Sequence, residues 1–498
     1  MVYARRAANP PMRLHTLDLA IIAVYLVAIT LFGLKFRKSQ RTLRDYFLAD
    51  RNIPWWAISL SIVAAETSTL TVIGTPGIAY AGNFGFLQLV FGYLLGRVVI
   101  TLLFIPQYFR GEMFTAYQLI DRRFGTTLHR ITSGVFLVTR AAAEGVRVWA
   151  VAIVVGIALN ITSDVWSVAI VMLLTLIYTF EGGMAAVIWT DVVQMFIYVA
   201  GTIAGLITLT HLVPGGWPAI HAATSAAGKL QVFDFSFSLF KGYTFWGGLI
   251  GGMFLNTASH GTDQLMVQRL LSARNQRESK LALLSSGAVI LAQFTLFLLM
   301  GAALWYFYKL NPSTARFASS DHVFPTFIVD HVPPGLAGLL IAAILAAAMS
   351  NLSAALNSLS STTMIDFYLR LRPQTPEGSR LSLSRGATLI WGAILFALAL
   401  ASRRGGEVLE AGLKIASVAY GGLLGVFLLG VLTRRATQTG AIAGMLCGLA
   451  LNAYIWKGTH IAFTWYVTLG TIATFAVGYV VSLATYQPME SMNADASR

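Results

Sequence analysis

Long apolar runs, separated by short polar or basic stretches, repeat along the whole chain of 498 residues. A helix that crosses a bilayer needs about 20 apolar residues. Barrel strands are far shorter, so helices are expected for segments of this length. The pattern therefore predicts an all-α polytopic membrane protein with thirteen transmembrane helices. We place them at 16–36, 54–80, 84–108, 130–160, 164–181, 184–212, 244–270, 281–308, 335–365, 384–402, 408–432, 437–456 and 463–485.

The connections between these segments predict the orientation of the chain. Basic residues gather at alternate connections, for example Lys35 and Lys38 after the first segment and Arg269 and Arg274 near the end of the seventh. Because cytoplasmic connections carry the excess of Lys and Arg, we expect the N-terminus outside and the C-terminus inside a bacterial inner membrane. The first segment lacks a small-residue cleavage site, so we expect a retained helix, with Met12 as an alternative start.

The longest outer connections, 213–243 and 309–334, are long enough to contain short helices of their own. We expect such helices to cover the outer face of the bundle.

Composition agrees with a membrane protein and narrows the possible functions. The chain is 56% hydrophobic but only 11% charged, whereas a soluble domain carries about 25% charged residues. The formal net charge of +14 follows from basic cytoplasmic connections and does not indicate a nucleic-acid partner. The single Cys447 excludes a disulfide framework, and the pair His260 and Asp263 lacks further ligands at metal spacing. No phosphate loop or nucleophile elbow is present, so we expect neither an enzyme nor a cofactor.

The second segment has a polar centre, Ala-Ala-Glu-Thr-Ser-Thr, at residues 64–69. The seventh segment, five helices later, contains Asn-Thr-Ala-Ser-His-Gly at 256–261. Small and polar residues at corresponding positions are typical of inverted repeats with broken helices around a midplane site. A broken helix also frees backbone carbonyls, which together with hydroxyl groups are suitable ligands for Na⁺.

Ionisable residues inside predicted membrane segments are costly and usually functional. The candidates are Glu66, Arg97, Arg140, Glu144, Arg147, Asp191, Asp263 and Lys414. Arg140, Glu144 and Arg147 share one face of the fourth helix, where Glu144 can neutralise one arginine. The remaining guanidinium is suited to bidentate binding of a carboxylate, and Arg147, the deeper of the two, is our candidate.

Two further polar features leave alternatives open. Asp191 has no Arg or Lys within one turn, so it could ligate a cation, carry a proton or pair with an arginine of another helix. In the ninth helix Ser350, Ser353, Asn357 and Ser361 recur at helical spacing on one face. Such a stripe fits either close helix packing through hydrogen bonds or a sodium site.

Three stretches resemble the sodium:solute symporter family: GGMAAVIWTDVVQ at 182–194, DQLMVQRLLSARN at 263–275 and AAAMSNLSAALNSLSSTTMIDFY at 346–368. The resemblance covers nearly the whole chain and implies the leucine-transporter fold with two inverted five-helix repeats, as one transmembrane domain over residues 1–498. It implies repeats at 54–212 and 244–432, an extra N-terminal helix at 16–36 and two extra C-terminal helices at 437–485.

The resemblance also implies a principal sodium site between the second and ninth helices. Its ligands would be the backbone of Ala64 and Thr67, the carbonyl of Ala347, and the side chains of Ser350 and Asn351. Family members usually have a hydroxyl residue at the position of Asn351, whose amide oxygen can also ligate Na⁺.

A second sodium site is implied by the likeness to sialic acid symporters. Asp191, Ser350 and Ser353 match its ligands, whereas Ala354 stands where those proteins have serine. One or two Na⁺ for each solute are therefore both open.

For the solute, the resemblance implies binding residues from two patterns. The sialic acid pattern matches Ser68, Thr71 and Gln88, with Arg147 as the carboxylate-binding residue, and the sugar-transporter pattern matches Asn256. Glu66 fits neither pattern and would pair with Arg147, bind an amine of the solute, or titrate.

We therefore expect a sodium-coupled symporter that imports a small carboxylate, such as a sialic acid, a sugar acid or a monocarboxylate, by alternating access. The expected partners are the solute, Na⁺ as coupling ion and the lipid bilayer, and a monomer is sufficient. One alternative is a neutral sugar, with Arg147 paired to Glu66 or Glu144. The other is a proton-coupled carrier that titrates at Asp191 or Glu66.

Overall fold

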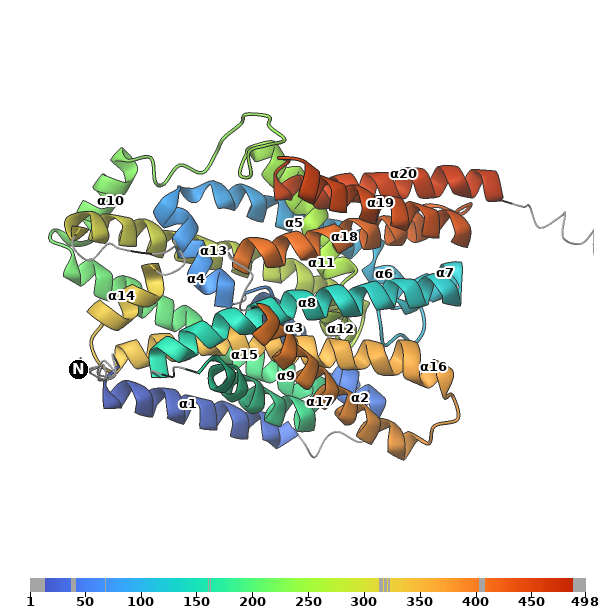
Figure 1. Cartoon of the computed structure of the whole chain (residues 1–498), viewed down its shortest axis with the longest axis horizontal. Coiled ribbons are helices and arrows are strands. Elements are labelled where there is room, and N and C mark those ends of the chain that lie inside the picture. The colour runs from blue at the N-terminus through green and yellow to red at the C-terminus, as the bar shows by residue number, and fades with distance from the viewer. Residues whose placement is uncertain are drawn as a thin grey trace, which may run out of the picture.

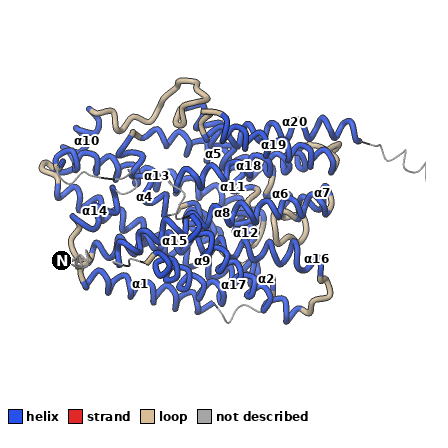
Figure 2. The backbone as a smooth tube through the Cα atoms, viewed as in Figure 1, coloured by secondary structure: helices blue, strands red, loops and turns tan. Residues whose placement is uncertain are grey.

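The computed structural model describes residues 14–36, 42–67, 69–159, 161, 163–312, 317, 320, 323–402 and 408–486. Within these residues the chain is a bundle of helices, most of which lie side by side along its longest axis (Figure 1). Figure 2 shows helix through almost the whole bundle, with loops that mostly join helix ends. The described residues form no β-strand, and Ile53 and Ala273 make an isolated bridge. The prediction of an all-α membrane fold is confirmed.

The N-terminal half contains ten α-helices in the described residues. They are α1 (Thr16–Leu34), α2 (Leu43–Leu48), α3 (Trp55–Glu66), α4 (Thr69–Ala81), α5 (Leu87–Leu103), α6 (Ile105–Tyr108), α7 (Gln118–Phe124), α8 (Thr126–Leu159), α9 (Asp164–Leu212) and α10 (Gly216–Ala226). The predicted segments 164–181 and 184–212 lie on the single element α9. This element changes direction at Gly183, whose positive φ of 55° a residue without a Cβ adopts readily.

The C-terminal half begins with a π-helical turn at Gly247–Gly251. It continues through α11 (Gly252–Gly261), α12 (Gln264–Leu271), α13 (Gln276–Leu310), α14 (Val323–His331) and α15 (Leu336–Thr362). A second π-helical turn (Thr363–Tyr368) leads to α16 (Leu369–Leu371), followed by α17 (Glu377–Ser402), α18 (Val408–Leu432), α19 (Gln438–Gly458) and α20 (Tyr466–Thr485). The short helices expected in the long connections 213–243 and 309–334 are α10 and α14.

In the described part of the chain, eight helices are long and apolar enough to cross a membrane, or nine if the bent pair α3–α4 is one span. Each of the thirteen predicted segments overlaps a helix. The number of thirteen transmembrane helices stays a prediction, since length and composition identify fewer.

Both helices with polar centres are broken, as predicted. The α3 helix ends at Glu66, Thr67 has an extended ψ of 94°, and α4 continues at an angle of 60°. The α11 helix ends at Gly261, and Asp263 starts α12 as an N-cap that accepts a hydrogen bond from the Leu265 amide at 2.9 Å. These breaks expose backbone groups in the middle of the bundle, where a site can use them.

The α15 helix lies at the centre of the bundle. It packs against α1, α3, α4, α8, α9, α12 and α17. The most apolar stretch of the helix is almost entirely buried among them. Its polar stripe bonds to neighbouring helices: Gln268 donates to Asn357 at 3.2 Å, and Gln264 donates to Ser361 at 3.3 Å. Along this part of the stripe, the small and polar residues therefore serve helix packing.

Candidate functional site

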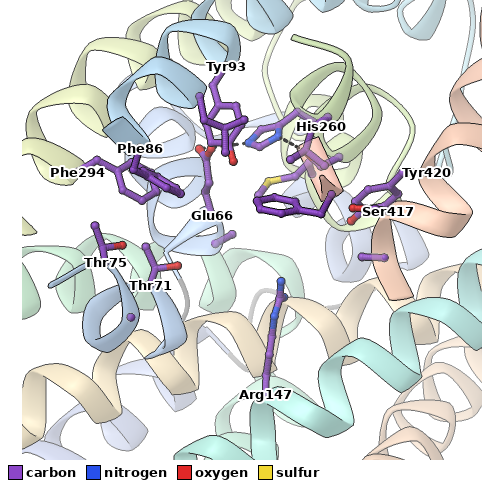
Figure 3. A pocket seen from close by; sticks show the side chains of 18 of the residues that line it. Glu66, Thr71, Thr75, Phe86, Tyr93, Arg147, His260, Phe294, Ser417 and Tyr420 are labelled. Atoms are coloured by element: carbon purple, nitrogen blue, oxygen red, sulfur yellow. Dashed lines mark hydrogen bonds and ion pairs between the residues drawn. The ribbon is translucent and has the colours of Figure 1, made fainter. Parts of the chain in front are cut away.

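A cavity of about 180 Å³ lies beside the break between α3 and α4 and reaches α8, α11 and α18. Much of its wall is apolar, formed by side chains such as Ile78, Leu255, Phe294 and Phe463. The polar lining residues include Glu66, Thr71, Thr75, Arg140, Arg147, Ser259 and His260. Figure 3 shows Arg147 and Glu66 extending toward the cavity from different sides. Predicted solute residues from separate helices thus meet at one cavity.

The Arg147 side chain extends from α8 to the cavity and is anchored by Glu144 of the same helix. Its Nη1 donates to Glu144 at 3.2 Å, and its side chain is 27% exposed, in contrast to 1% for Glu144. Its Nε and Nη2 have no partner among the described residues. Two donor nitrogens, with three N–H groups between them, are therefore available to solute oxygens.

The prediction that Glu144 neutralises only one arginine is wrong. Arg140 also donates to Glu144, at 3.3 Å. A second carboxylate balances the pair: Asp263 lies 3.4 Å from Nη1 of Arg140 and accepts a hydrogen bond from Tyr420 at 2.7 Å. The charge of Arg147 is thus balanced, and its guanidinium is partly exposed because of its position beside the cavity.

Asn351 joins this arrangement to the broken helix. Its Oδ1 accepts from Arg147 at 3.1 Å and from Arg140 at 3.4 Å, and its Nδ2 donates to the Ala65 carbonyl at 2.7 Å. The amide therefore turns its nitrogen toward the break and its oxygen toward the arginines. We call Arg140, Glu144, Arg147 and Asn351 the open cluster.

Asp191 lies in a second cluster that is closed to solvent. Arg269 of α12 donates to it at 2.8 Å, and the hydroxyls of Ser61 and Ser350 also donate to it. All four side chains are buried. Of the alternatives left open, the structure shows the ion pair with an arginine of another helix. The interpretation of Arg269 as a topology-setting loop residue is wrong, because it is buried inside the bundle. We call Asp191, Arg269, Ser61 and Ser350 the sealed cluster.

Glu66 forms a third polar group at the end of α3. It pairs with the buried Arg97 of α5, and His260 Nε2 of α11 lies 3.3 Å from its Oε2. Arg97 also donates to Ser286 at 3.0 Å. The suggested pairing of Glu66 with Arg147 is not present. We call Glu66, Arg97 and His260 the Glu66 pole.

Close packing of α5 on α11 builds this pole. A Cβ on Gly92 would lie 2.4 Å from the Gly248 carbonyl oxygen, and one on Gly96 would lie 2.8 Å from Asn256 Cβ. Glycine at both positions lets the helices approach, which brings Arg97 beside the face of α11 that carries Asn256 and His260. Asn256 lies 3.1 Å from His260 Nδ1, behind the cavity wall.

The other predicted solute residues have different positions. Thr71 lines the cavity, and Ser68 lies outside the described residues. Gln88 is buried, where it donates to the Gly85 and Tyr243 carbonyls and accepts from the Asp234 amide. Gln88 therefore holds the loop that contains Asp234 and Tyr243, and it is not among the cavity-lining side chains.

The predicted sodium ligands surround the junction of α3 and α15. Ala64 and Thr67 lie at the end of α3, and Ala347 and Ser350 lie on α15. The Thr67 hydroxyl accepts a hydrogen bond from Gln293 at 2.7 Å. Ser353 donates to the Ser350 carbonyl at 2.9 Å.

The roles of Arg97 and His260 were not foreseen. The sequence carried one signal for the first: Arg97 and Glu66 are opposite charges on adjacent predicted membrane helices, each without a partner within one turn. His260 gave no such signal, because its contact with Glu66 depends on how α11 packs against α3 and α5.

Known proteins resemble this chain over most of its length, both in sequence and in structure. The sequence model of the sodium:solute symporter family matches residues 46–448. A sodium/sialic acid symporter of Proteus mirabilis is 28% identical, over 98% of this chain and 99% of that protein. Sodium-coupled monocarboxylate transporter 1 of Xenopus laevis is 29% identical, over 89% of this chain and 72% of that protein. A substrate-bound, outward-open Na⁺-coupled sialic acid symporter has a similar structure, with a TM-score of 0.87 at 26% identity over 95% and 99% of the two chains.

Proposed function

The chain belongs to the sodium:solute symporter family, and we propose that it couples the inward movement of Na⁺ to the uptake of a small carboxylate. It is a multi-pass membrane protein whose relatives are sodium-coupled transporters. The position of Arg147 carries the proposal for a carboxylate. Its Nε and Nη2 are side-by-side donors of the kind that bind both oxygens of a carboxylate.

Charge balance explains why such a solute would require a cation. With Asp263, the open cluster contains two arginines and two carboxylates, and the sealed cluster and the Glu66 pole each pair one arginine with one carboxylate. The charges of these described arginines and carboxylates around the cavity therefore cancel. A carboxylate or a Na⁺ that enters alone adds an uncompensated charge to a poorly hydrated space, whereas the two together do not.

For the principal sodium site we propose Ala64, Thr67, Ala347 and Ser350. The Ser350 hydroxyl uses its hydrogen on Asp191 at 2.7 Å, so its oxygen lone pairs are available to a cation. Asn351 would have to rotate its amide to join them, because in this structure its nitrogen faces the break.

A second sodium at Asp191, Ser350 and Ser353 is also proposed. It would bind beside the existing pair of Asp191 with Arg269, which weakens the attraction for a further cation. We therefore expect the second site to be the weaker of the two.

The proposed orientation places the N-terminus outside and the C-terminus inside a bacterial inner membrane. The proposed repeats are 54–212 and 244–432, with the extra helix 16–36 before them and 437–485 after them. Each repeat would contribute one broken helix to the midplane site, and one chain would be sufficient for transport.

Transport by purified protein in proteoliposomes tests this function. We expect uptake of labelled butanoate or a sialic acid when Na⁺ is outside, and uptake at background level when choline replaces Na⁺. A solute that raises the melting temperature only with Na⁺ present would support coupled binding. Uptake that needs an inward pH gradient and persists without Na⁺ would contradict the proposal, as would uptake limited to neutral sugars.

A further inference from the structure

The cavity has a second polar end that the carboxylate-binding role of Arg147 does not use. We propose that the Glu66 pole binds a hydroxyl group of the solute, and that the solute is a small monocarboxylate with an apolar body and a hydroxyl group distant from its carboxylate. This inference rests on the proposed function.

Glu66 offers one carboxylate oxygen to the cavity. Its contacts with Arg97 and His260 both use Oε2, while Oε1 has no partner among the described residues. The side chain is only 9% exposed, and it lines the cavity. A carboxylate oxygen in such a position is an acceptor only, so it selects a solute group that carries a hydrogen.

The charge of the Glu66 pole favours a hydroxyl over an ammonium group. Arg97 is 1% exposed and already neutralises Glu66. An ammonium group would add a positive charge next to this neutral pair. A solute with both a carboxylate and an ammonium is itself neutral, so for any number of bound Na⁺ it leaves the site one positive charge above the value reached with a hydroxylated carboxylate. With one Na⁺, the hydroxylated carboxylate leaves no excess charge.

The apolar part of the cavity wall favours an apolar body for the solute. Leu255, Phe294 and Phe463 line the cavity and offer no hydrogen bond from their side chains. Any hydroxyl of a sugar ring that faces these three side chains would lack a partner, which is unfavourable. An aliphatic chain meets no such cost.

The size of the cavity agrees with a small organic solute. The cavity of about 180 Å³ is about ten times the roughly 10–15 Å³ that one enclosed water molecule needs, so it accepts a solute of several non-hydrogen atoms.

Matched solutes test the inference in proteoliposomes that contain the full chain. Uptake of labelled butanoate with Na⁺ is measured in competition with pentanoate, ω-hydroxypentanoate and ω-aminopentanoate. We expect ω-hydroxypentanoate to compete about tenfold to a hundredfold better than pentanoate, the range for a hydrogen bond to a charged group. It should also compete better than ω-aminopentanoate. Equal competition by the hydroxylated and plain acids, or preference for the amino acid, would overturn the inference.

Variants locate the preference at Glu66. The double variant Glu66→Gln/Arg97→Gln removes both charges together and should reduce the hydroxyl preference to within about threefold, because a charge-assisted bond becomes a neutral one. Thr75→Val is the matched control: it removes a hydroxyl from the same cavity and should keep the full preference. Loss of the preference in Thr75→Val alone would place the hydroxyl site on α4 and overturn the assignment.

The outcomes separate this inference from the proposed function. Sodium-dependent uptake of the carboxylates without any hydroxyl preference contradicts only the inference. Absence of sodium-dependent uptake for every carboxylate tested contradicts the function on which it rests.

Discussion

Ser350 and Asn351 are consecutive residues of α15, yet they belong to clusters with opposite properties. Ser350 donates to Asp191 in the sealed cluster, where Asp191 and Arg269 are 0% and 1% exposed. Asn351 accepts from Arg147 in the open cluster, where the guanidinium is 27% exposed. Both clusters contain arginine and carboxylate side chains. They differ in solvent exposure and in the number of arginine N–H groups without a hydrogen-bond partner.

This difference separates stability from binding. In the sealed cluster, Arg269 donates to Ser61, Leu265 and Asp191, so the ion pair is fully supported by hydrogen bonds. Removal of one partner would leave a buried charge, which is strongly destabilising. In the open cluster, Arg147 can exchange contacts with a solute while Glu144 keeps Arg140. The sealed cluster is therefore suited to hold helices together, and the open cluster is suited to recognise the solute.

The largest expected effect is that of Asp191→Ala. It would leave Arg269 buried without a counter-charge and cost about 3–5 kcal/mol of folding stability. We expect a large fall in the melting temperature of the detergent-solubilised protein. The double variant Asp191→Leu/Arg269→Met, which removes both charges, should recover most of that stability. A double variant as unstable as Asp191→Ala would contradict the role of a closed ion pair.

Arg147→Ala should show the reverse pattern. We expect at least a tenfold loss of carboxylate uptake, since a charge-assisted hydrogen-bond pair is lost. The melting temperature should change little, because the side chain is partly exposed and Glu144 retains Arg140. Arg147→Lys keeps the charge but not the paired donors, so its uptake should be intermediate. Unchanged uptake by Arg147→Ala would contradict the assignment of the open cluster to the solute.

Much of the fold was predictable from the sequence, and the reason is physical. Apolar length identifies membrane helices, and polar residues such as Glu66 and Thr67 identify a break, because these signals lie within one segment. The common face of Arg140, Glu144 and Arg147 also follows from spacing on one helix, although the prediction that Glu144 neutralises one arginine only is wrong. The contacts that distinguish the clusters do not follow from such spacing. Asp191 and Arg269 are 78 residues apart, and Arg147 and Asn351 are 204 apart. Such contacts depend on how helices rotate and pack.

Asn351 is the residue whose expected role changed most, and Asn351→Ser tests it. The substitution supplies the hydroxyl that family members usually have and removes the donor to the Ala65 carbonyl. We expect the half-saturating Na⁺ concentration to fall by about threefold, a change on the scale of one neutral hydrogen bond. The matched control is Asn357→Ser on the same helix, because the hydrogen bonds of Asn357 in the described part of the chain are with Gln268 and the Met184 sulfur, outside both clusters. Equal sodium responses in the two variants would contradict the role of Asn351.

The smallest expected effect concerns a charge pair at the surface, outside the predicted membrane segments. Arg370 donates to both carboxylate oxygens of Asp121, and the two side chains are 24% and 27% exposed. Partial burial raises the pKa of Asp121, but the hydrogen bonds and charge of Arg370 outweigh it and hold the pKa below its ordinary value. A carboxylate whose pKa is lower in the folded state stabilises the fold above its unfolded-state pKa, and this contribution is lost as pH falls through the folded-state pKa.

Solvent screening limits this contribution to less than about 1 kcal/mol. Asp121→Asn should therefore lower the melting temperature slightly at neutral pH, and this difference should disappear as the pH falls through the lowered folded-state pKa of Asp121, where the wild-type carboxyl also becomes protonated. Added salt should reduce the neutral-pH difference, because exposed charges are screened. A fall in melting temperature at neutral pH as large as that of Asp191→Ala would contradict this interpretation. It would mean that burial does not decide how much an ion pair contributes to stability.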